Sequence, residues 1–314
     1  MTIWRDLDGA ETTPRSERAA VTVGVFDGVH RGHQHVLAAT RAAAADGASV
    51  VAVTFEPHPL EVLTPDRTPK RLTTVERRID LLHAHGADEV RVLAFDQHMS
   101  AWTPEEFIQR VLADELRSSA VVVGENFRFG SRAAGDVDLL RRAGAESGFT
   151  VEGLALDGGA EPFSSTLVRA HVATGHLPEA AVILGRPHEV SGEVVEGDRR
   201  GRSLGFPTAN IPVDDVYAVP PDGVYAGRVD IGAEVLAAAI SVGTNPTFGG
   251  RDRRVESYII DRPAEGGLDL YGKQIRVELV RWLRGMDVFD TVDALVAQMH
   301  EDVADTRTVL AELG

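Results

Sequence analysis

The 314-residue chain contains no cysteine, and its basic residues are outnumbered by acidic ones. The lack of cysteine excludes disulfides, thiolate metal sites and cysteine nucleophiles. Lys and Arg total 32 against 48 Asp and Glu, which gives a formal charge of −16. Such a surface would repel nucleic-acid phosphates and anionic membranes. We therefore expect neither nucleic acid nor a membrane among the partners.

Long apolar runs are also missing. No apolar stretch approaches the roughly 18 residues that a membrane span needs, and the chain opens at Met1 without the basic and apolar regions of a signal peptide. The cytoplasm is the expected location. The chain has the composition of an ordinary globular protein, 43% apolar and 25% charged, and its length suits about two domains.

The first half of the chain alternates strand and helix patterns. Residues 1–20 are polar and aperiodic, which predicts an arm. Short β-branched runs predict strands at 21–26, 49–55, 90–95 and 120–123. Helix signals separate these runs, among them a capping box at residues 103–106 with proline at the first helical position. The alternation predicts a doubly wound, Rossmann-like parallel sheet within one α/β domain, residues 1–184.

After residue 184 the pattern changes to strand and turn. Short runs between Gly, Pro and Asp clusters predict strands at 190–195, 223–229, 235–242, 255–260 and 275–280. Apolar residues from Val292 to Leu310, including Val303, recur at helical spacing and predict a long terminal helix. Residues 185–314 are therefore predicted to form a small antiparallel barrel or sandwich with a terminal helix.

A segment rich in glycine and histidine, residues 24–34, follows the first predicted strand and opens the first predicted helix. In a doubly wound sheet ligands bind at this edge, and a helix N-terminus offers N–H groups to phosphate. Gly28 and Gly32 would let the backbone approach closely, and His30 and His33 could donate to phosphate oxygens. The segment is neither a dinucleotide fingerprint nor a P-loop. A histidine metal cluster, or histidines with a structural role only, remain alternatives.

A second unusual segment, residues 197–210, has glycines every four residues with arginines between them. Such a loop could wrap polyphosphate with its backbone N–H groups, although basic glycine-rich loops are often only solvated turns. Thr208 and Asn210 lie two apart on a predicted strand, so their oxygens share a face and could bind one Mg²⁺. On a later strand Glu256 shares a face with Tyr258, which predicts a partly apolar setting for its carboxylate.

Several segments together resemble the bacterial bifunctional riboflavin kinase/FAD synthetase family. His30-x-Gly32-His33 looks like the HxGH signature of nucleotidylyltransferases. Family blocks in the first half are matched at residues 24–30, 54–59, 124–130 and 164–169. Pro207-Thr208-Ala209-Asn210 resembles the riboflavin kinase signature, and residues 223–227, 245–249 and 269–273 match the same module. The resemblance covers the chain from about residue 21 to 310.

The resemblance implies an ATP- and Mg²⁺-dependent enzyme with two active sites. Residues 1–184 would be an FMN adenylyltransferase, in which the FMN phosphate attacks the α-phosphate of ATP and pyrophosphate leaves. Residues 185–314 would be a riboflavin kinase with a β-barrel fold, which turns riboflavin into FMN. An enzyme with one active module, or a flavin-binding regulator without turnover, is the alternative. Oligomeric state stays open, self-association included.

In the first site, the family match implies that His30 and His33 stabilise the ATP phosphates and the transition state. Ser165, Thr166 and Arg169 would hold the phosphate chain, and Asn126 would contact FMN or the phosphates. The full set of implied ATP- and flavin-binding residues is Gly24, Phe26, Asp27, Gly28, Gly32, Asn126, Ser164, Ser165, Thr166 and Arg169. The Ser-Ser-Thr run could also cap a helix before Val168, a role that uses the same donors.

In the second site, Glu256 holds the position that the family uses as base, where it would accept the ribityl hydroxyl proton as the hydroxyl attacks the ATP γ-phosphate. An ordinary strand-edge carboxylate is the alternative for Glu256. Thr208 and Asn210 would bind Mg²⁺. The implied ATP- and flavin-binding residues are Gly197, Arg199, Gly201, Arg202, Gly205, Pro207, Thr208 and Asn210.

Overall fold

A computed structural model describes residues 2–5, 15–155, 162–197, 204–245, 252–262 and 269–313. Contacts between residues divide the chain into two compact units. Unit 1 comprises Met1–Pro69 and Val75–Ser164, and unit 2 comprises Lys70–Thr74 and Ser165–Gly314. The predicted division between residues 184 and 185 stays a prediction.

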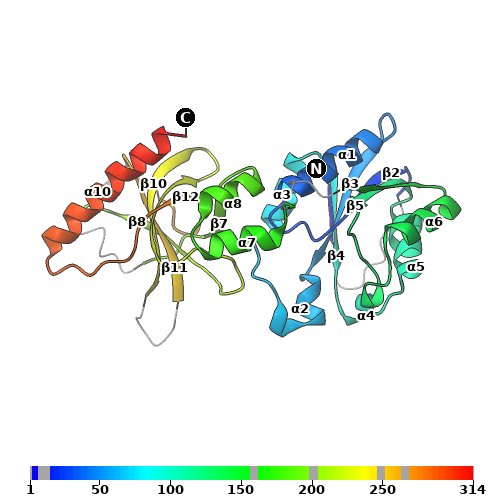
Figure 1. Cartoon of the computed structure of the whole chain (residues 1–314). Helices are drawn as coiled ribbons and strands as arrows, with labels where there is room; N and C mark the ends of the chain where they lie inside the picture. The colour runs from blue at the N-terminus through cyan, green and yellow to red at the C-terminus, as the bar shows by residue number, and fades with distance from the viewer. Residues whose placement is uncertain are drawn as a thin grey trace. The chain divides into compact units, whose positions relative to one another are not determined.

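Unit 1 is built on a six-stranded sheet of order β1-β4-β3-β2-β5-β6 (Figure 1). Its strands are β1 (Thr2–Arg5), β2 (Ala19–Val23), β3 (Ser49–Glu56), β4 (Glu89–Ala94), β5 (Ser118–Gly124) and β6 (Thr150–Leu154). Every neighbouring pair is parallel. From β2 the chain builds one side of the sheet with β3 and β4 and then the other with β5 and β6, so the strand order reverses at β2. The predicted doubly wound sheet is confirmed.

Helices cover both faces of this sheet. The described helices of unit 1 are α1 (Arg31–Ala43), α2 (Pro59–Leu63), α3 (Val75–Ala84), α4 (Gln97–Ser100), α5 (Pro104–Phe107), α6 (Val137–Ser147) and the π-helix η2 (Ile108–Glu115), with 3₁₀ turns η1 (Pro65–Arg67) and η3 (Ser131–Ala133). Successive residues of a strand point to opposite faces. One face packs on α1 and α3, through Leu37 and Ile79, and the other packs on α4, α5, η2 and α6. The core therefore has two layers.

The predicted capping box is present at the start of α5. The Thr103 hydroxyl accepts a hydrogen bond from the Glu106 backbone N–H at 3.1 Å, and the Glu106 carboxylate accepts one from the Thr103 N–H at 2.9 Å. Pro104 occupies the first helical position, where its missing N–H costs nothing. Local side-chain chemistry therefore fixes where this helix begins.

The predicted arm at residues 1–20 is partly wrong. Thr2–Arg5 form β1, which pairs with β4 from Thr2 opposite Glu89 to Arg5 opposite Val92. Ala19 already belongs to β2. An edge strand can be held by backbone hydrogen bonds alone, so a short segment without hydrophobic periodicity can still extend a sheet. Hydrophobic patterning gave no signal for β1 for that reason.

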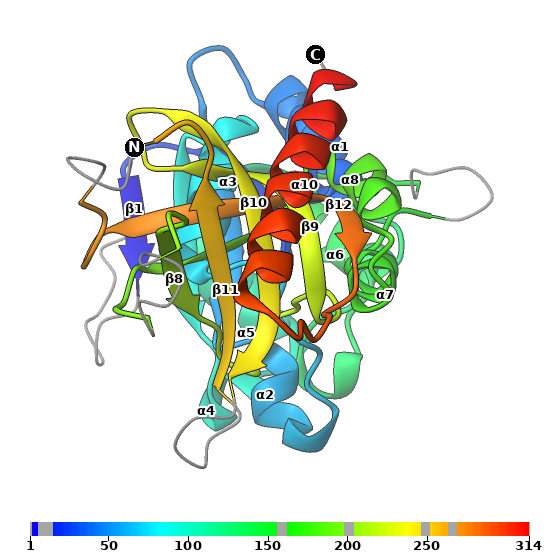
Figure 2. The same ribbon diagram turned by 90° about the vertical axis from the view of Figure 1, so that its left-hand side faces the viewer.

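Unit 2 contains a six-stranded antiparallel sheet of order β7-β12-β9-β10-β11-β8, which curls on itself (Figures 1 and 2). The strands are β7 (His188–Glu193), β8 (Thr208–Pro212), β9 (Gly223–Asp230), β10 (Val235–Asn245), β11 (Asp252–Ile259) and β12 (Gln274–Arg284). The two ends of this order meet just past β7, where the Val195 N–H donates to the Asn210 carbonyl of β8 at 2.9 Å. The predicted small antiparallel barrel is confirmed.

The described helices of unit 2 are α7 (Ser165–Ala173), α8 (Leu177–Leu184) and the terminal α10 (Val292–Ala311). Helix α10 lies against the outer face of the barrel, over β9 and β10 (Figures 1 and 2). The apolar pattern placed Val292 on its packed face, but Val292 is 58% exposed, whereas Asp302 is buried. Asp302 can be buried because the Arg284 guanidinium donates to both of its carboxylate oxygens, at 2.7 and 2.8 Å.

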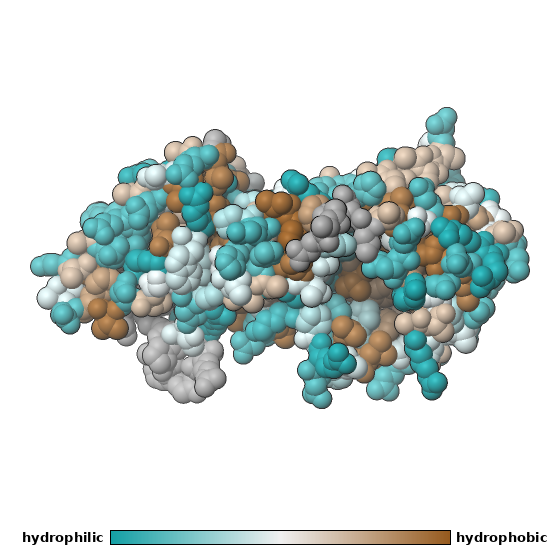
Figure 3. Space-filling model, viewed as in Figure 1, coloured by the Kyte–Doolittle hydropathy of each residue, from teal (hydrophilic) through white to brown (hydrophobic). Residues whose placement is uncertain are grey.

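Hydrophilic residues dominate the molecular face in Figure 3, and hydrophobic ones lie there in small separate patches. This distribution agrees with the 25% of charged residues and the net charge of −16. Among the described residues, no helix combines the length and the apolar character that crossing a membrane would require.

Candidate active sites

The loop between β2 and α1 holds the first group of predicted site residues. It follows the carboxyl end of β2, where the strand order reverses. The loop turns sharply, and the Val29 N–H donates to the Phe26 carbonyl at 3.0 Å. Phe26 and Val29 have φ angles of 54° and 40°, and Gly28 has a φ of 80°. Residues other than glycine rarely adopt such φ angles. Strained backbone of this kind is often found at ligand-binding sites.

His30 and His33 meet at the start of α1. Their rings stack with centroids 3.6 Å apart and planes inclined by 23°, and the Phe26 ring meets His33 edge-on at 5.1 Å. His30 is the N-cap residue of α1, so His33 lies in the first turn, where backbone N–H groups have no acceptor within the helix. Gly32 permits this stack, because a Cβ there would lie 3.1 Å from Cε1 of His30.

The pKa of His33 lies well below its ordinary value. Burial is the main cause, and the neighbouring His30 and the Arg78 guanidinium lower the pKa of His33 further. Two stacked imidazolium rings would also repel each other at this distance. The Nδ1 atom of His33 is buried and has no hydrogen-bond partner among the described residues. The site therefore presents a neutral imidazole beside a helix start, which suits hydrogen bonding to an anion.

Other predicted residues lie in the same loop or at the end of a neighbouring strand. Gly24 leaves room for the Phe26 ring, since a Cβ at Gly24 would lie 3.0 Å from that ring. Asp27 is buried in the same loop. Asn126 is exposed in the turn after β5, the strand that pairs with β2. Because the carboxyl ends of parallel strands share one edge, Asn126 and the histidine loop lie at neighbouring strand ends.

Residues 164–169 lead into helix α7, which begins at Ser165 and belongs to unit 2. Ser164 and Ser165 are half-buried, and Thr166 is exposed. The Arg169 Nε donates to the Lys70 carbonyl at 2.5 Å, also within unit 2. Ser164 itself is assigned to unit 1 with the histidine loop.

In unit 2 a pocket of about 390 Å³ lies between the outer face of the barrel and α10. Its apolar lining includes Leu204, Phe206, Leu295, Met299 and Val303. The polar groups in its wall include Thr208, Ser241, Glu256, Tyr258, Arg284 and Asp302. A largely apolar pocket with a few convergent polar groups is typical of a small-molecule site.

Strand register places Glu256 in this pocket. Glu256 of β11 lies opposite Asn210 of β8 and Ser241 of β10, and Tyr258 lies opposite Thr208. Directly opposed residues point to the same face of a sheet, so all five share the outer face. Their neighbours in β11 point the other way into the barrel, as the predicted alternation requires: Val255, Ser257 and Ile259 are buried.

Asn210 has the features of a ligand for a hard cation. Its side chain is buried, and its Nδ2 donates to the Thr208 carbonyl at 3.1 Å and to the Thr208 hydroxyl at 3.3 Å. Its Oδ1 is buried and finds no hydrogen-bond partner within the described part of the chain. Amide and hydroxyl oxygens are ligands that Mg²⁺ accepts. The residues present therefore fit that ion.

The loop before β8 is described at its two ends. Gly197 lies against Asn210, where a Cβ would come within 2.6 Å of Nδ2. Gly205 has a φ of 87°, and the ring of the buried Phe206 packs on Tyr258 at 4.8 Å. Pro207 is half-buried and directly precedes β8. The predicted site residues Arg199, Gly201 and Arg202 lie outside the described residues. Across the described ranges, no cluster of three His, Cys, Asp or Glu could hold a metal.

Sequence reasoning missed an aromatic group in unit 1. Phe55, Phe95 and Phe127 are partly buried at or just past the ends of β3, β4 and β5, and Trp102 joins the same hydrophobic cluster. The Phe55 and Phe95 rings meet at a right angle with centroids 5.9 Å apart. The available signal was that Phe55 and Phe95 end predicted strands and Phe127 follows one closely, at the edge where ligands bind.

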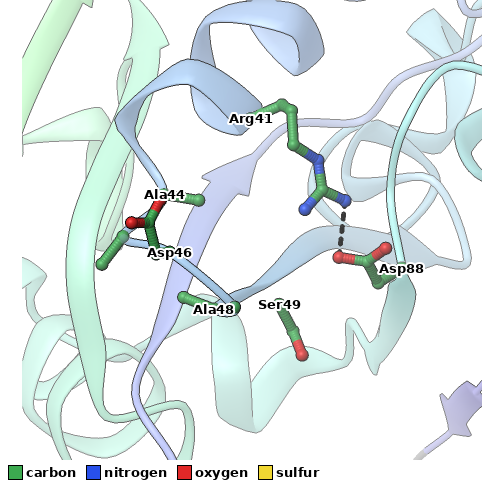
Figure 4. A pocket seen from close by; sticks show the side chains of 8 residues that line it. Arg41, Ala44, Asp46, Ala48, Ser49 and Asp88 are labelled. Atoms are coloured by element: carbon green, nitrogen blue, oxygen red, sulfur yellow. Dashed lines mark hydrogen bonds and ion pairs between the residues drawn. The ribbon is translucent and has the colours of Figure 1, made fainter.

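A second pocket, of about 480 Å³, lies where α1 ends and β3 begins (Figure 4). Arg41 and Asp88 form an ion pair at its rim, with Nη2 and Oδ2 2.5 Å apart. This pocket borders the amino end of β3, the opposite edge from the histidine loop. Ligands of doubly wound sheets bind at the carboxyl edge, so the pocket is not part of the candidate site.

Comparison with known proteins gives two family matches. A family model described as FAD synthetase matches residues 12–167, and one described as riboflavin kinase matches residues 184–310. Proteins named bifunctional riboflavin kinase/FMN adenylyltransferase are similar over nearly the whole chain. The one from Escherichia coli (strain K12) is 36% identical and covers 98% of this chain and 97% of its own. The one from Bacillus subtilis (strain 168) is 32% identical and covers 91% and 90%.

A solved structure has the same fold over the whole length. It is a crystal structure described as a macrolide-efflux protein from Streptococcus pneumoniae, with a TM-score of 0.84 at 30% sequence identity. The match covers 98% of this chain and 99% of that one. Both units of the present chain therefore have counterparts within one solved chain.

Proposed function

Since the chain belongs to the family of bifunctional riboflavin kinases/FMN adenylyltransferases, we propose that it makes FAD in two steps. ATP first phosphorylates riboflavin to FMN in unit 2, and a second ATP then adenylylates FMN to FAD and pyrophosphate in unit 1. One observation carries the proposal. The stacked His30 and His33 lie at a helix start, and Glu256 lies in a pocket wall opposite Asn210, an arrangement that supports both steps.

The kinase step needs a proton acceptor beside the flavin ribityl chain. Glu256 takes the proton of the 5′-hydroxyl as that oxygen attacks the ATP γ-phosphate and ADP leaves. The apolar pocket lining, Phe206 and Met299 included, packs on the flavin ring and keeps water from the reacting oxygen. Glu256 and the apolar groups line the same pocket. A flavin bound in one orientation can therefore pack its ring on the apolar groups and place its 5′-hydroxyl beside Glu256.

Thr208 and Asn210 would hold Mg²⁺ through the hydroxyl and the amide oxygen. When bound there, the ion would offset negative charge on the ATP phosphates. The Asn210 amide has a fixed orientation, because its Nδ2 donates to Thr208. Its Oδ1 points away from that contact and is available to the ion. Gly197, Arg199, Gly201, Arg202, Gly205 and Pro207 form the loop that we assign to the phosphate chain.

In the adenylyl transfer an FMN phosphate oxygen attacks the α-phosphorus of ATP, and the bond to the bridging oxygen of pyrophosphate breaks. This reaction depends on positioning and on charge stabilisation. His30 and His33 donate hydrogen bonds to the phosphates, together with the first-turn N–H groups of α1. Gly24, Phe26, Asp27, Gly28 and Gly32 shape that loop. For Ser164, Ser165, Thr166 and Arg169 the family motif alone supports a role in phosphate binding.

The aromatic group at the carboxyl edge of unit 1 suits the other half of FMN. A flavin ring is flat and aromatic, and it packs well against phenylalanine rings. Phe55, Phe95 and Phe127 lie at or just past the carboxyl ends of β3, β4 and β5 and keep part of their surface exposed. We assign the isoalloxazine ring to these side chains, with Asn126 beside it.

The test is a time course with the purified protein, riboflavin, ATP and Mg²⁺, with flavins separated by chromatography, repeated with FMN as the starting flavin. FMN should appear first and FAD after it, and FMN alone should yield FAD. Chelation of the ion with EDTA should stop FMN formation. Tight flavin binding without either product would contradict the proposal and favour a flavin-binding regulator.

A further inference from the structure

Arg78 is a buried cation beside the histidine loop. It lies in the first half of α3 and is 1% exposed. Its Nη1 donates to the Thr54 hydroxyl at 3.1 Å and to the Phe55 carbonyl at 2.9 Å, and its Nη2 lies 3.5 Å from a Glu56 carboxylate oxygen. These three partners are consecutive residues at the carboxyl end of β3. A buried charge with several fixed partners occupies a defined position.

Thr54 connects Arg78 to the loop that carries the histidines. The Thr54 hydroxyl accepts from Arg78 and donates to the Val25 carbonyl at 2.9 Å. The Gly24 N–H of the same loop donates to the Val53 carbonyl at 3.0 Å. Hydrogen bonds in such a chain polarise one another. The strained turn at Phe26 and Val29 is therefore held from β3 and, through Thr54, from α3.

We propose that Arg78 is a positioning residue of the adenylyltransferase site, which fixes the histidine loop through Thr54 and places a permanent positive charge behind the stacked His30 and His33. The inference rests on the adenylyl transfer proposed above. A fixed charge behind the site strengthens its attraction for triphosphate at any pH where ATP is ionised. It also disfavours the charged form of His33.

The charges around His33 support this role. On its own helix His33 stacks with His30, and from α3 the Arg78 guanidinium acts on it. Glu56 of β3 stands beside Arg78 and partly offsets its charge, and Asp27 lies in the same loop. Both His30 and Arg78 lower the pKa of His33, in addition to burial. Removing the guanidinium charge should therefore raise the pKa of His33 toward its ordinary value.

A purely structural role for Arg78 makes different predictions. An arginine that only fills the core would, when replaced, destabilise unit 1 without a specific effect on ATP or on His33. Two measurements separate the roles: the dependence of FAD formation on ATP concentration, and the titration of His33 followed by NMR with ¹³C-labelled histidine. The riboflavin kinase step of the same chain reports whether each variant is folded.

Three variants and one control make the test. Arg78→Met removes the charge at similar length, Arg78→Lys keeps the charge, and Thr54→Val removes only the connecting hydroxyl. Arg142→Met is the matched control, because Arg142 is an exposed arginine on α6 in the same unit. Arg78→Met should lower kcat/KM for ATP in the FMN-to-FAD step by about tenfold or more and raise the pKa of His33.

Arg78→Lys should retain the low pKa of His33 and most of the activity. Thr54→Val should reduce FAD formation and leave the pKa of His33 unchanged, and Arg142→Met should change neither. All four variants should phosphorylate riboflavin at the wild-type rate.

Wild-type ATP kinetics together with an unchanged His33 titration in Arg78→Met would overturn the inference. If Arg78→Met fails to fold, the other two variants decide: a raised His33 pKa in Arg78→Lys, or wild-type FAD formation in Thr54→Val, contradicts it. Failure of the proposed function looks different, because wild-type protein would then make no FAD from FMN. The His33 titration would still show whether Arg78 controls the charge of that ring.

Discussion

The two candidate sites are built in different ways. In unit 1 the reactive side chains are close in the sequence, and a strained loop and a helix start bring His30 and His33 into a stack. In unit 2 they are far apart in the sequence, and strand register sets Asn210 opposite Glu256. The first site should therefore be sensitive to changes in backbone conformation, and the second to changes in individual side chains. Substitutions that act on one site only test this difference.

The largest effect is expected from Glu256→Gln. The amide keeps the shape of the side chain but cannot accept a proton, so FMN formation should fall by about 10²- to 10⁴-fold. Conversion of added FMN to FAD should persist, and chromatography of the flavins measures both. Glu278→Gln is the control, because Glu278 is a half-buried carboxylate on β12. Loss of both steps in Glu256→Gln would mean that the sites are not independent.

Loss of the histidines should give the next largest effect. His30→Ala and His33→Ala each remove contacts to the phosphates, and lost transition-state contacts typically lower a rate by about 10²-fold or more. FAD formation from FMN should drop accordingly, with riboflavin phosphorylation unchanged. FAD formation within about threefold of wild type in both variants would make the assignment of these residues wrong.

A smaller effect is expected from Gly197→Ala. The new Cβ would meet the Asn210 side chain at 2.6 Å, so the amide must move. The Mg²⁺ concentration for half-maximal kinase activity should rise, by roughly tenfold if Asn210 is a ligand. In the control Gly243→Ala the Cβ meets only Met286 Cε, at 3.7 Å, and the Mg²⁺ dependence should not change. If both variants show the same Mg²⁺ dependence, Asn210 is not a ligand of the ion.

Backbone strain is tested by Gly28→Ala. Gly28 has a φ of 80°, and an alanine there should cost about 1–2 kcal/mol of unfolding free energy. Gly47→Ala is the matched variant, with a φ of 78° and open space around it. Both should destabilise unit 1 similarly in urea, but only Gly28→Ala should slow FAD formation. A slowed adenylyl transfer in both variants would assign the effect to stability instead of loop geometry.

The smallest effect is expected from Arg41→Met at the pocket of Figure 4. The ion pair between Arg41 and Asp88 is about half exposed, with side-chain exposures of 44% and 47%. Exposed pairs of this kind contribute about 0–1 kcal/mol. Stability in urea and both activities should stay near wild type. A selective loss of either activity would show that the amino edge of the sheet takes part in function.

Features that depend on local pattern could be predicted from the sequence. The parallel sheet followed from alternating strands and helices, and the histidine loop followed from its place after the first strand. Alternation along β11 was enough to place Glu256 and Tyr258 on one face. Each of these features depends on residues within a few positions of one another or on the family motifs.

Features that depend on tertiary contacts could not be predicted. Strand β1 is held by backbone pairing with β4, which leaves no mark on hydrophobic pattern. Arg78 is buried although charged residues, Glu76 and Arg77, directly precede it, and its hydrogen-bond partners lie on β3. Asp302 lies in an otherwise ordinary amphipathic helix, and its ion pair with the distant Arg284 makes its burial possible. In each case the deciding partner is distant in the sequence.

The claim that the chain holds two separate active sites is tested most directly by assaying Glu256→Gln and His33→Ala side by side. Each is given riboflavin and, separately, FMN, with ATP and Mg²⁺, and the flavins are separated by chromatography. Glu256→Gln should make FAD from FMN but almost no FMN from riboflavin. His33→Ala should make FMN from riboflavin but almost no FAD. If either variant loses both reactions while remaining folded, the two-site account is contradicted.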